Sequence, residues 1–356
     1  MLRFALIGCG QHGRNAVMPG LLKHAGHVKL CAVADLHAEN LESAKALGCA
    51  VYTDYKQMLV EQRVDAVYIA TLQEAHLEQV LAALAAGLHV VCEKPMAPTA
   101  DECRTMIEAA ERAGRHLVVN FETRYHRHHQ RIRQWIGDGR IGRVEAIHVQ
   151  DFWDGHKRTG CMAERRARLM DRAGGLDCGI HKIDLVHHLC GSGQWASMEA
   201  MGAWLGEEER LLAPHIAILG RLDIGTLVTI NASLGYAAGI KPRPRQDLLT
   251  VVGTEGVISL TMDSPSMQAY ADSTYKATLY DDAGDEQVAA EYPNHSIAIG
   301  RLVDDLASYL ESGTCPPDLP LGEAGLNAQV IAEAANERAV ATRLRPTAMQ
   351  QGMTEV

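Results

Sequence analysis

Residues 2–13 read Leu-Arg-Phe-Ala-Leu-Ile-Gly-Cys-Gly-Gln-His-Gly, an apolar run that leads directly into a glycine-rich turn. The turn has the Gly-x-Gly-x-x-Gly spacing of a dinucleotide-binding loop. In such a loop Gly8 makes the tight turn, Gly10 lets the backbone approach a pyrophosphate, and Gly13 lets the helix pack closely on the strand. Gln11 and His12 are expected to line the same cofactor site. The stretch therefore predicts a doubly wound α/β domain of the Rossmann type at the start of the chain.

The pattern of apolar runs changes near residue 122. Before that point short runs at 28–34, 64–70, 88–92 and 117–121 alternate with helical stretches at 39–47, 74–86 and 101–113, as in βαβ units around a parallel sheet. After it, strand-like runs at 144–153, 216–222, 227–234, 247–252 and 257–261 follow one another, and helices are expected near 179–190, 297–312 and 323–341. This succession predicts a mostly antiparallel sheet. We expect a cofactor-binding Rossmann domain over residues 1–122 and a substrate-binding and oligomerisation domain over 123–356, with a catalytic helix at 177–190.

Composition excludes several classes of function. A chain of 356 residues is expected to form two domains. The formal net charge of −10 argues against a nucleic-acid partner, and no segment is long and apolar enough to cross a membrane. The nine cysteines form no Cys-x-x-Cys pair, which favours free thiols in a reducing compartment. Because the glycine motif begins at Gly8, we expect no signal peptide and a cytoplasmic location.

Asp35 ends the second apolar run, at the distance from the glycine motif expected of the residue that binds the adenosine ribose. A carboxylate there accepts both ribose hydroxyls and repels a 2′-phosphate. Neither Leu36 nor His37 supplies the arginine of an NADP site, so NAD is expected in preference to NADP. The alternative is that Asp35 only caps the next helix.

The run at 88–92 leads into Glu93-Lys94-Pro95. Ligands of doubly wound sheets bind outside the carboxyl ends of the strands, so Lys94 is directed at the crevice where a nicotinamide would lie. Glu93 is expected beside the cofactor, and Pro95 holds Lys94 extended. The alternative, a surface lysine in a turn, leaves the acid-lysine-proline end of a buried strand unexplained.

The helix after Gly174-Gly175 carries one polar line on an otherwise apolar surface. At about 100° per residue, a single stripe contains Asp177, His181, Asp184 and His188. Burying ionisable side chains is energetically costly, and a position in the lining of an active site would explain why this helix carries them. The stripe could instead bind a divalent ion in an isomerase or hydrolase, but Lys94 and the glycine loop would then lack a purpose. We therefore expect no metal. A second histidine group, His126, His128 and His129, is expected to be a solvated helix start.

Three motifs together resemble the Gfo/Idh/MocA oxidoreductase family, which includes inositol and glucose-fructose dehydrogenase-type enzymes. They are the Gly8–Gly13 loop, Glu93-Lys94-Pro95 and Asp177-x-Gly179-x-His181-x-x-Asp184. The resemblance covers essentially the whole chain and implies that Lys94, Asp177 and His181 are catalytic. It also implies assembly of a homodimer or homotetramer through the open face of the C-terminal sheet.

The resemblance extends to the surroundings of the site. It places Arg124 and Tyr125 near the substrate, and we add Asp184 and Trp153, which opens a basic stretch up to residue 172 that could form a lid. One departure follows Ala70, where the family usually has Thr-Pro-Asn and this chain has Thr71-Leu72-Gln73. The residues expected at the cofactor from this segment are Thr71, Gln73 and His76.

These residues predict an NAD-dependent oxidoreductase that transfers a hydride between nicotinamide and a hydroxyl carbon of a sugar, inositol or similar polyol. His181 would act as general acid/base and Lys94 would polarise the reacting oxygen. Two alternatives remain open: a redox-neutral epimerase or glycoside-eliminating enzyme with tightly bound NAD, and a non-catalytic NAD/sugar sensor. The sequence does not rank inositols, aldoses, amino sugars or sugar acids as substrates.

Overall fold

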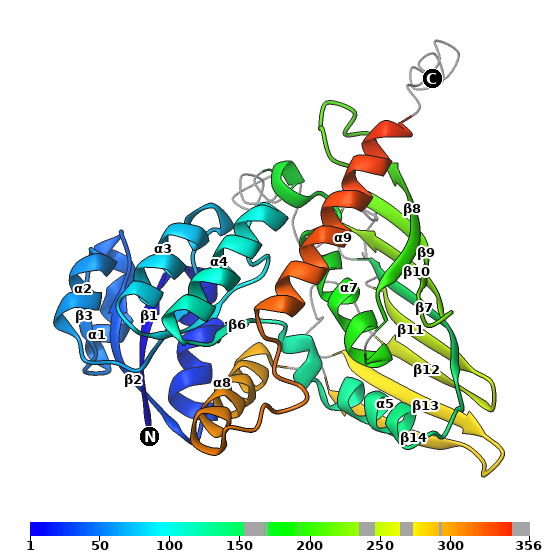
Figure 1. Cartoon of the computed structure of the whole chain (residues 1–356), viewed down its shortest axis with the longest axis horizontal. Coiled ribbons are helices and arrows are strands. Elements are labelled where there is room, and N and C mark those ends of the chain that lie inside the picture. Colours follow the sequence, from blue (N-terminus) through cyan, green and yellow to red (C-terminus); the bar gives the residue numbers. More distant parts are fainter. Residues whose placement is uncertain are drawn as a thin grey trace.

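The computed structural model describes residues 1–152, 167, 170–191, 193–234, 246–263, 273–291 and 294–343. Two sheets organise the chain (Figure 1). The first is parallel and has the strand order β3-β2-β1-β4-β5-β6, which is the doubly wound Rossmann order predicted from the sequence. Its strands are β1 (Leu2–Ile7), β2 (Val28–Ala34), β3 (Ala50–Tyr52), β4 (Ala66–Ile69), β5 (His89–Cys92) and β6 (Leu117–Val119).

Both faces of this sheet are covered, because alternate residues of each strand point to opposite faces. On β1, Ala5 and Ile7 belong to the core cluster under helices α3 and α4, whereas Phe4 and Leu6 belong to the cluster on the other face. Helix α8 packs in that second cluster although it comes late in the chain. The helical elements here are η1 (Gly13–Val17), η2 (Gly20–His24), η3 (Ala38–Leu41), α1 (Glu42–Ala46), α2 (Tyr55–Glu61), α3 (Gln73–Ala85), α4 (Ala100–Ala113) and α8 (His295–Ser312).

The second sheet has the order β14-β13-β12-β11-β7-β10-β9-β8. The β7–β10 pair is parallel and the other neighbouring strands are antiparallel, so the predicted fold class is confirmed. The strands are β7 (Val144–Phe152), β8 (Trp195–Ala203), β9 (His215–Leu222), β10 (Leu227–Ser233), β11 (Gln246–Gly253), β12 (Gly256–Asp263), β13 (Thr274–Asp281) and β14 (Glu286–Glu291).

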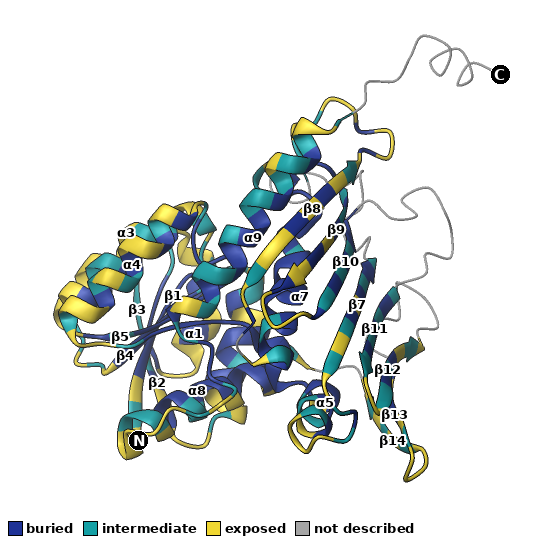
Figure 2. Ribbon diagram, turned by 45° about the vertical axis from the view of Figure 1, so that its right-hand side comes forward, coloured by how far each residue is buried: buried dark blue, intermediate teal, exposed yellow. Residues whose placement is uncertain are grey.

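Three helices lie between this sheet and the Rossmann domain (Figure 1). They are α5 (Arg127–Gly137), α7 (Leu176–Cys190) and α9 (Gly322–Ala341), preceded by the short turn η4 (Glu122–Tyr125). No described helix covers the opposite face of the sheet (Figure 2). The strands also carry the exposed residues Met201, Leu219 and Tyr280, each of which directly follows a buried residue of its strand. Assembly through this face remains a prediction.

Helix α7 can approach the sheet closely because of Gly179. A Cβ atom at this position would lie 2.8 Å from the Cβ of Ala232 on β10. The glycine of the Asp177-x-Gly179-x-His181 motif is thus required by packing, and it fixes the side of α7 that faces away from the sheet. No helix among the described residues combines the length and the apolar character needed to cross a bilayer.

Candidate active site

The glycine loop after β1 is shaped by contacts that exclude side chains at two of its three glycines. Gly8 has a φ of 96°, and a Cβ there would lie 2.6 Å from the carbonyl oxygen of Ala70. A Cβ at Gly13 would lie 2.2 Å from the carbonyl oxygen of Gly8. At Gly10, by contrast, a Cβ would meet nothing within 4 Å. The loop is therefore open at the position where a pyrophosphate would approach, so it fits the dinucleotide predicted from the motif.

Asp35 holds the same loop from the end of β2. Its Oδ2 accepts a hydrogen bond from the backbone N–H of Cys9 at 2.6 Å, and its Oδ1 accepts from the backbone N–H of His37 at 2.9 Å. Asn40 also donates to Oδ1, at 3.0 Å. The carboxylate thus connects the glycine loop to the turn after β2. Half-buried Asp35 stands at the carboxyl edge of the sheet, where a ribose-binding acid is required.

Glu93 is buried, and its carboxylate connects β4, the residue after β6 and the glycine loop. Its Oε1 accepts from the hydroxyl of Tyr68 at 2.8 Å, from the amide of Asn120 at 2.8 Å and from His12 Nε2 at 2.9 Å. Tyr68 and Asn120 were not singled out from the sequence. Asn120 directly follows β6, so the end of that strand, like the end of β5, was the signal that could have identified it.

The loops after β4 and β5 are joined through His76. Its imidazole is buried, and its nitrogens lie 3.1 Å from the carbonyl oxygens of Pro95 and Met96 and 3.3 Å from that of Thr71. Thr71 in turn donates to Gln79 at 2.6 Å. His76 therefore positions the two loops that flank Lys94. Gln73 begins α3 beside them and is half-buried.

Lys94 and helix α7 meet directly. Lys94 Nζ donates to the carbonyl oxygen of Asp177 at 2.9 Å and lies 3.9 Å from Asp177 Oδ2. Burial lowers the pKa of Lys94, but the surrounding negative groups, of which Asp177 has the largest effect, together outweigh burial and raise the pKa above its ordinary value. The side chain is therefore a partly buried ammonium fixed at the carboxyl end of β5.

His181 lies one turn after Asp177 on α7. Its Nε2 is 3.9 Å from Glu122 Oε1, its ring meets Phe121 edge-on at 5.9 Å, and its Nδ1 is buried without a hydrogen-bond partner. The pKa of His181 is lowered to about 4. Burial is the main cause and Lys94 adds to it, whereas Glu122 acts in the opposite direction. The imidazole is thus neutral near pH 7. Glu122, which the sequence analysis missed, also accepts from His295 Nδ1 at 3.0 Å.

The residues predicted near the substrate differ in what they contact in the structure. Arg124 Nε and Nη2 donate to the two carboxylate oxygens of Asp184 at 2.8 and 2.6 Å, and both side chains are buried. These two residues therefore bind each other, and they join η4 to α7. The Tyr125 hydroxyl donates to Asp305 Oδ2 at 2.9 Å. Trp153 and most of the basic stretch that follows it lie outside the described residues.

One of the two histidine groups differs from expectation. His126, His128 and His129 are buried, so the prediction of a solvated helix start is wrong. Their side chains point into the space between η4, α5 and β13, where His128 stacks on Tyr275. Within the described part of the chain they form a group of three potential metal ligands with ligand atoms within 4.8 Å of one another. The α7 stripe forms no such group there, and His188 lies 3.2 Å from Asp318 instead.

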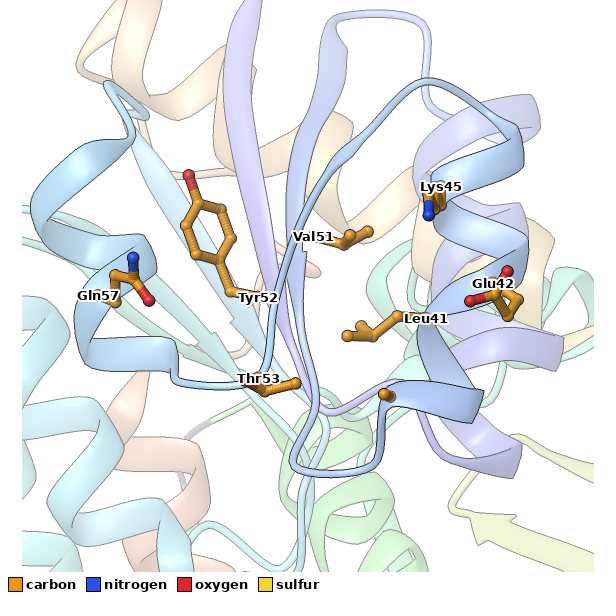
Figure 3. Close-up of a pocket in the computed structure, with 8 residues that line it drawn as sticks. Leu41, Glu42, Lys45, Val51, Tyr52, Thr53 and Gln57 are labelled. Carbon is orange, nitrogen blue, oxygen red and sulfur yellow. The ribbon is translucent and has the colours of Figure 1, made fainter.

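A pocket of about 370 Å³ lies at the β3 edge of the Rossmann sheet (Figure 3). Val51 of β3 points toward the side of α1, which carries Glu42 and Lys45, whereas Tyr52 lies on the other side of the strand, toward Gln57 of α2. None of the catalytic candidates lines it. The convergence of side chains at the ends of β5, β6 and α7 therefore locates the candidate active site better than the size of a pocket does.

Comparison with known proteins agrees with this arrangement. Residues 2–121 match the model of an oxidoreductase family with an NAD-binding Rossmann fold, and residues 129–259 match the model of the Gfo/Idh/MocA C-terminal domain. A 1,5-anhydro-D-fructose reductase from Ensifer adhaerens is 36% identical over 150 residues, which is 42% of this chain and 45% of that protein. An inositol 2-dehydrogenase from Saccharopolyspora erythraea is 32% identical over 193 residues, 53% of this chain and 54% of that protein. The aligned part thus spans about half the length of these curated relatives.

Solved structures share the fold over nearly the full chain. An oxidoreductase from Agrobacterium radiobacter, crystallised with NAD+, L-tartaric acid and magnesium, has a TM-score of 0.80 at 21% identity and covers 96% of this chain and 97% of its own. A myo-inositol 2-dehydrogenase from Lactobacillus plantarum has a TM-score of 0.76 at 21% identity, with coverage of 96% and 98%. With both domains matched by family models and the fold matched throughout, the chain belongs to the Gfo/Idh/MocA family of oxidoreductases.

Proposed function

We propose that this protein is an NAD-dependent oxidoreductase that moves a hydride between nicotinamide and a hydroxyl carbon of a polyhydroxylated substrate. One observation carries the proposal. The ammonium of Lys94 at the end of β5 is bonded to the first turn of α7, and α7 presents a buried, neutral His181 one turn later. A fixed cation and a proton acceptor at the carboxyl edge of a Rossmann sheet are the two groups that alcohol oxidation requires beside the cofactor.

His181 carries the proton in this mechanism. Because burial lowers its pKa to about 4, the imidazole is unprotonated at neutral pH and accepts the hydroxyl proton as the hydride leaves. Its Nδ1 has no hydrogen-bond partner in the described part of the chain. Glu122, 3.9 Å from Nε2, stabilises the imidazolium that forms. In the reductive direction the same histidine returns the proton.

In this mechanism Lys94 stabilises the oxygen of the substrate hydroxyl that is oxidised. Its ammonium is held by Asp177 and does not need to reorganise when negative charge develops on the reacting oxygen, which is the condition for effective electrostatic catalysis. Asp177 positions Lys94 through its carbonyl oxygen, and its carboxylate is placed to accept from a neighbouring substrate hydroxyl. The buried Arg124–Asp184 pair connects η4 to α7 and so positions the helix.

NAD fits the loop after β1, where Gly10 leaves room for the pyrophosphate and Asp35 stands where the ribose hydroxyls would lie. When bound, the nicotinamide supplies the hydride acceptor or donor. Asp35 and the absence of an arginine at 36 and 37 favour NAD over NADP. Inositol and anhydrohexose enzymes among the relatives support a cyclic polyol or sugar as substrate. A homodimer or homotetramer in a cytoplasmic setting is part of the same proposal.

The test uses NADH absorbance with purified protein, NAD or NADP, and a panel of inositols, aldoses and sugar acids. We expect NADH formation with one class of polyol, and we expect His181→Ala and Lys94→Ala to lose turnover far more than NAD affinity. His27→Ala is the matched control, because this exposed histidine is held by its backbone and directly precedes β2, at the amino end of the strand rather than at the carboxyl end where the candidate site lies.

The same experiment distinguishes the remaining functions. NAD binding with no NADH formation across the panel, together with epimerised or cleaved substrate, would establish the redox-neutral alternative. NAD binding with an unchanged substrate in every case would favour the sensor. Equal loss of turnover and NAD affinity in both variants would contradict the division of roles between Lys94 and His181.

A further inference from the structure

Three histidines that the proposed reaction does not use are buried together at the junction of η4 and α5. The exposed fractions of His126, His128 and His129 are 8%, 1% and 1%, whereas Arg127 between them is exposed. The ring centroids of His128 and His129 are 4.3 Å apart, and the ring of His126 lies 5.5 Å from each. The chain therefore turns three imidazoles inward from four consecutive residues.

The nitrogens of this cluster lack partners. Among the residues that the structure describes, no hydrogen-bond partner is found for His126 Nε2, for either nitrogen of His128 or for His129 Nε2, although all four atoms are buried. Buried polar atoms in folded proteins almost always have a partner, because leaving one unsatisfied is destabilising, so each exception calls for an explanation. The ring of His128 stacks on that of Tyr275, with the centroids 4.3 Å apart, but this contact provides no hydrogen bond to the nitrogens of His128.

His129 shows the second feature of a metal ligand. Its Nδ1 lies 2.8 Å from the carbonyl oxygen of Thr123, which can only accept, so Nδ1 carries the proton and donates. Nε2 of the neutral ring then carries a lone pair that points into the cluster. Histidines that bind metals usually donate their other ring N–H to a backbone carbonyl or carboxylate in this way, which fixes both the tautomer and the ring orientation.

We propose that His126, His128 and His129 bind one divalent transition-metal ion, with Zn²⁺ as the preferred ion. Their candidate ligand atoms already lie within 4.8 Å of one another. Tetrahedral Zn–N bonds of 2.0–2.1 Å require nitrogens about 3.3 Å apart, which moderate rotation of the rings supplies. Imidazole ligands suit zinc and other late first-row ions and disfavour Mg²⁺ and Ca²⁺. Three protein ligands leave a fourth position for water.

The charged groups around the cluster are compatible with a cation. Asp247 accepts from Lys182 at 2.7 Å and from the hydroxyl of Tyr275, the residue that stacks on His128, at 2.9 Å. Glu122, at the start of η4, interacts electrostatically with His126. A bound ion would therefore face two carboxylates and one ammonium. Because η4 also carries Arg124, the ion would fix the segment that joins the two domains.

Zinc binding to tag-free, chelator-treated protein tests the proposal, with metal content measured by mass spectrometry and affinity by competition with a chromophoric chelator. We expect one tightly bound Zn²⁺ per chain, no competition by Mg²⁺, and a loss of affinity of roughly 100-fold or more in His128→Gln. His27→Ala should bind as the unmodified protein does, since it removes only an exposed imidazole. Unchanged affinity in His128→Gln, or no zinc bound by the unmodified protein, would overturn the proposal.

A second measurement covers the case in which His128→Gln does not fold. Co²⁺ bound to the unmodified protein should give the intense visible spectrum of a tetrahedral site and should be displaced by one equivalent of Zn²⁺. A weak octahedral spectrum would contradict a three-histidine site. Neither readout depends on catalysis, so this proposal can fail while the proposed oxidoreductase function stands.

Discussion

Replacing Arg124 with methionine would leave the Asp184 carboxylate buried without its partner. The exposed fractions of Arg124 and Asp184 are 8% and 1%, and the pair is bidentate, with distances of 2.8 and 2.6 Å. Removing one partner of such a pair typically costs 3–5 kcal/mol, because the remaining charge stays desolvated. We therefore expect Arg124→Met to lower the free energy of unfolding by about 4 kcal/mol, and Asp184→Leu to lower it by a similar amount.

The double variant Arg124→Met, Asp184→Leu separates this explanation from simple loss of packing. It removes both charges together, and replacement of a whole buried ion pair by apolar residues is often neutral or even stabilising. We expect it to be more stable than either single variant. Urea unfolding, followed by circular dichroism and by tryptophan fluorescence, provides the measurement, because coincident curves are required for a two-state free energy. Single variants that cost under about 1 kcal/mol, or a double variant that costs their sum, would refute the reasoning.

Three further predictions concern the cofactor and the proton. Gly10→Ala should fold normally and lose NAD affinity in titration calorimetry, whereas Gly13→Ala should also lower the melting temperature, because its Cβ would lie 2.2 Å from the carbonyl oxygen of Gly8. Asp35→Ser should narrow the preference for NAD over NADP, measured as the ratio of kcat/KM values, and an unchanged ratio would argue against a ribose contact. The pKa of His181 is about 4 instead of the ordinary 6.5, so kcat/KM for alcohol oxidation should stay level as pH falls from 7 and decline only near pH 4; a midpoint near 6.5 would contradict the lowered pKa.

The Rossmann domain could be predicted from the sequence because several independent signals agree there. Strands covered on both faces are nearly continuous in apolar residues, and the glycine spacing identifies the loop after the first of them. The second sheet was only partly predictable. Edge strand β14 has the sequence Glu-Gln-Val-Ala-Ala-Glu, whose residues favour helices, and its conformation is decided by pairing with β13.

The candidate site was predictable where side chains follow strand ends and unpredictable where burial decides their role. Lys94 follows β5, and its direction followed from that position alone. For the histidines at 126, 128 and 129, a polar run near a helix start indicates solvent exposure, but contacts with Tyr275 far along the chain bury them. Likewise, the sequence could not show that Arg124 and Asp184 pair with each other, because they are separated by 60 positions.

Glu93 and Lys94 show how consecutive residues can couple the two halves of the site. The carboxylate of Glu93 binds His12 of the cofactor loop and Asn120 after β6, whereas the ammonium of Lys94 binds the first turn of α7. One short stretch after β5 therefore contacts both the cofactor loop and helix α7. A displacement of the glycine loop would thus move Glu93, and Lys94 would shift relative to His181. In the proposed mechanism, the geometry of proton and hydride transfer would therefore depend on the same buried hydrogen bonds that hold the cofactor loop in place.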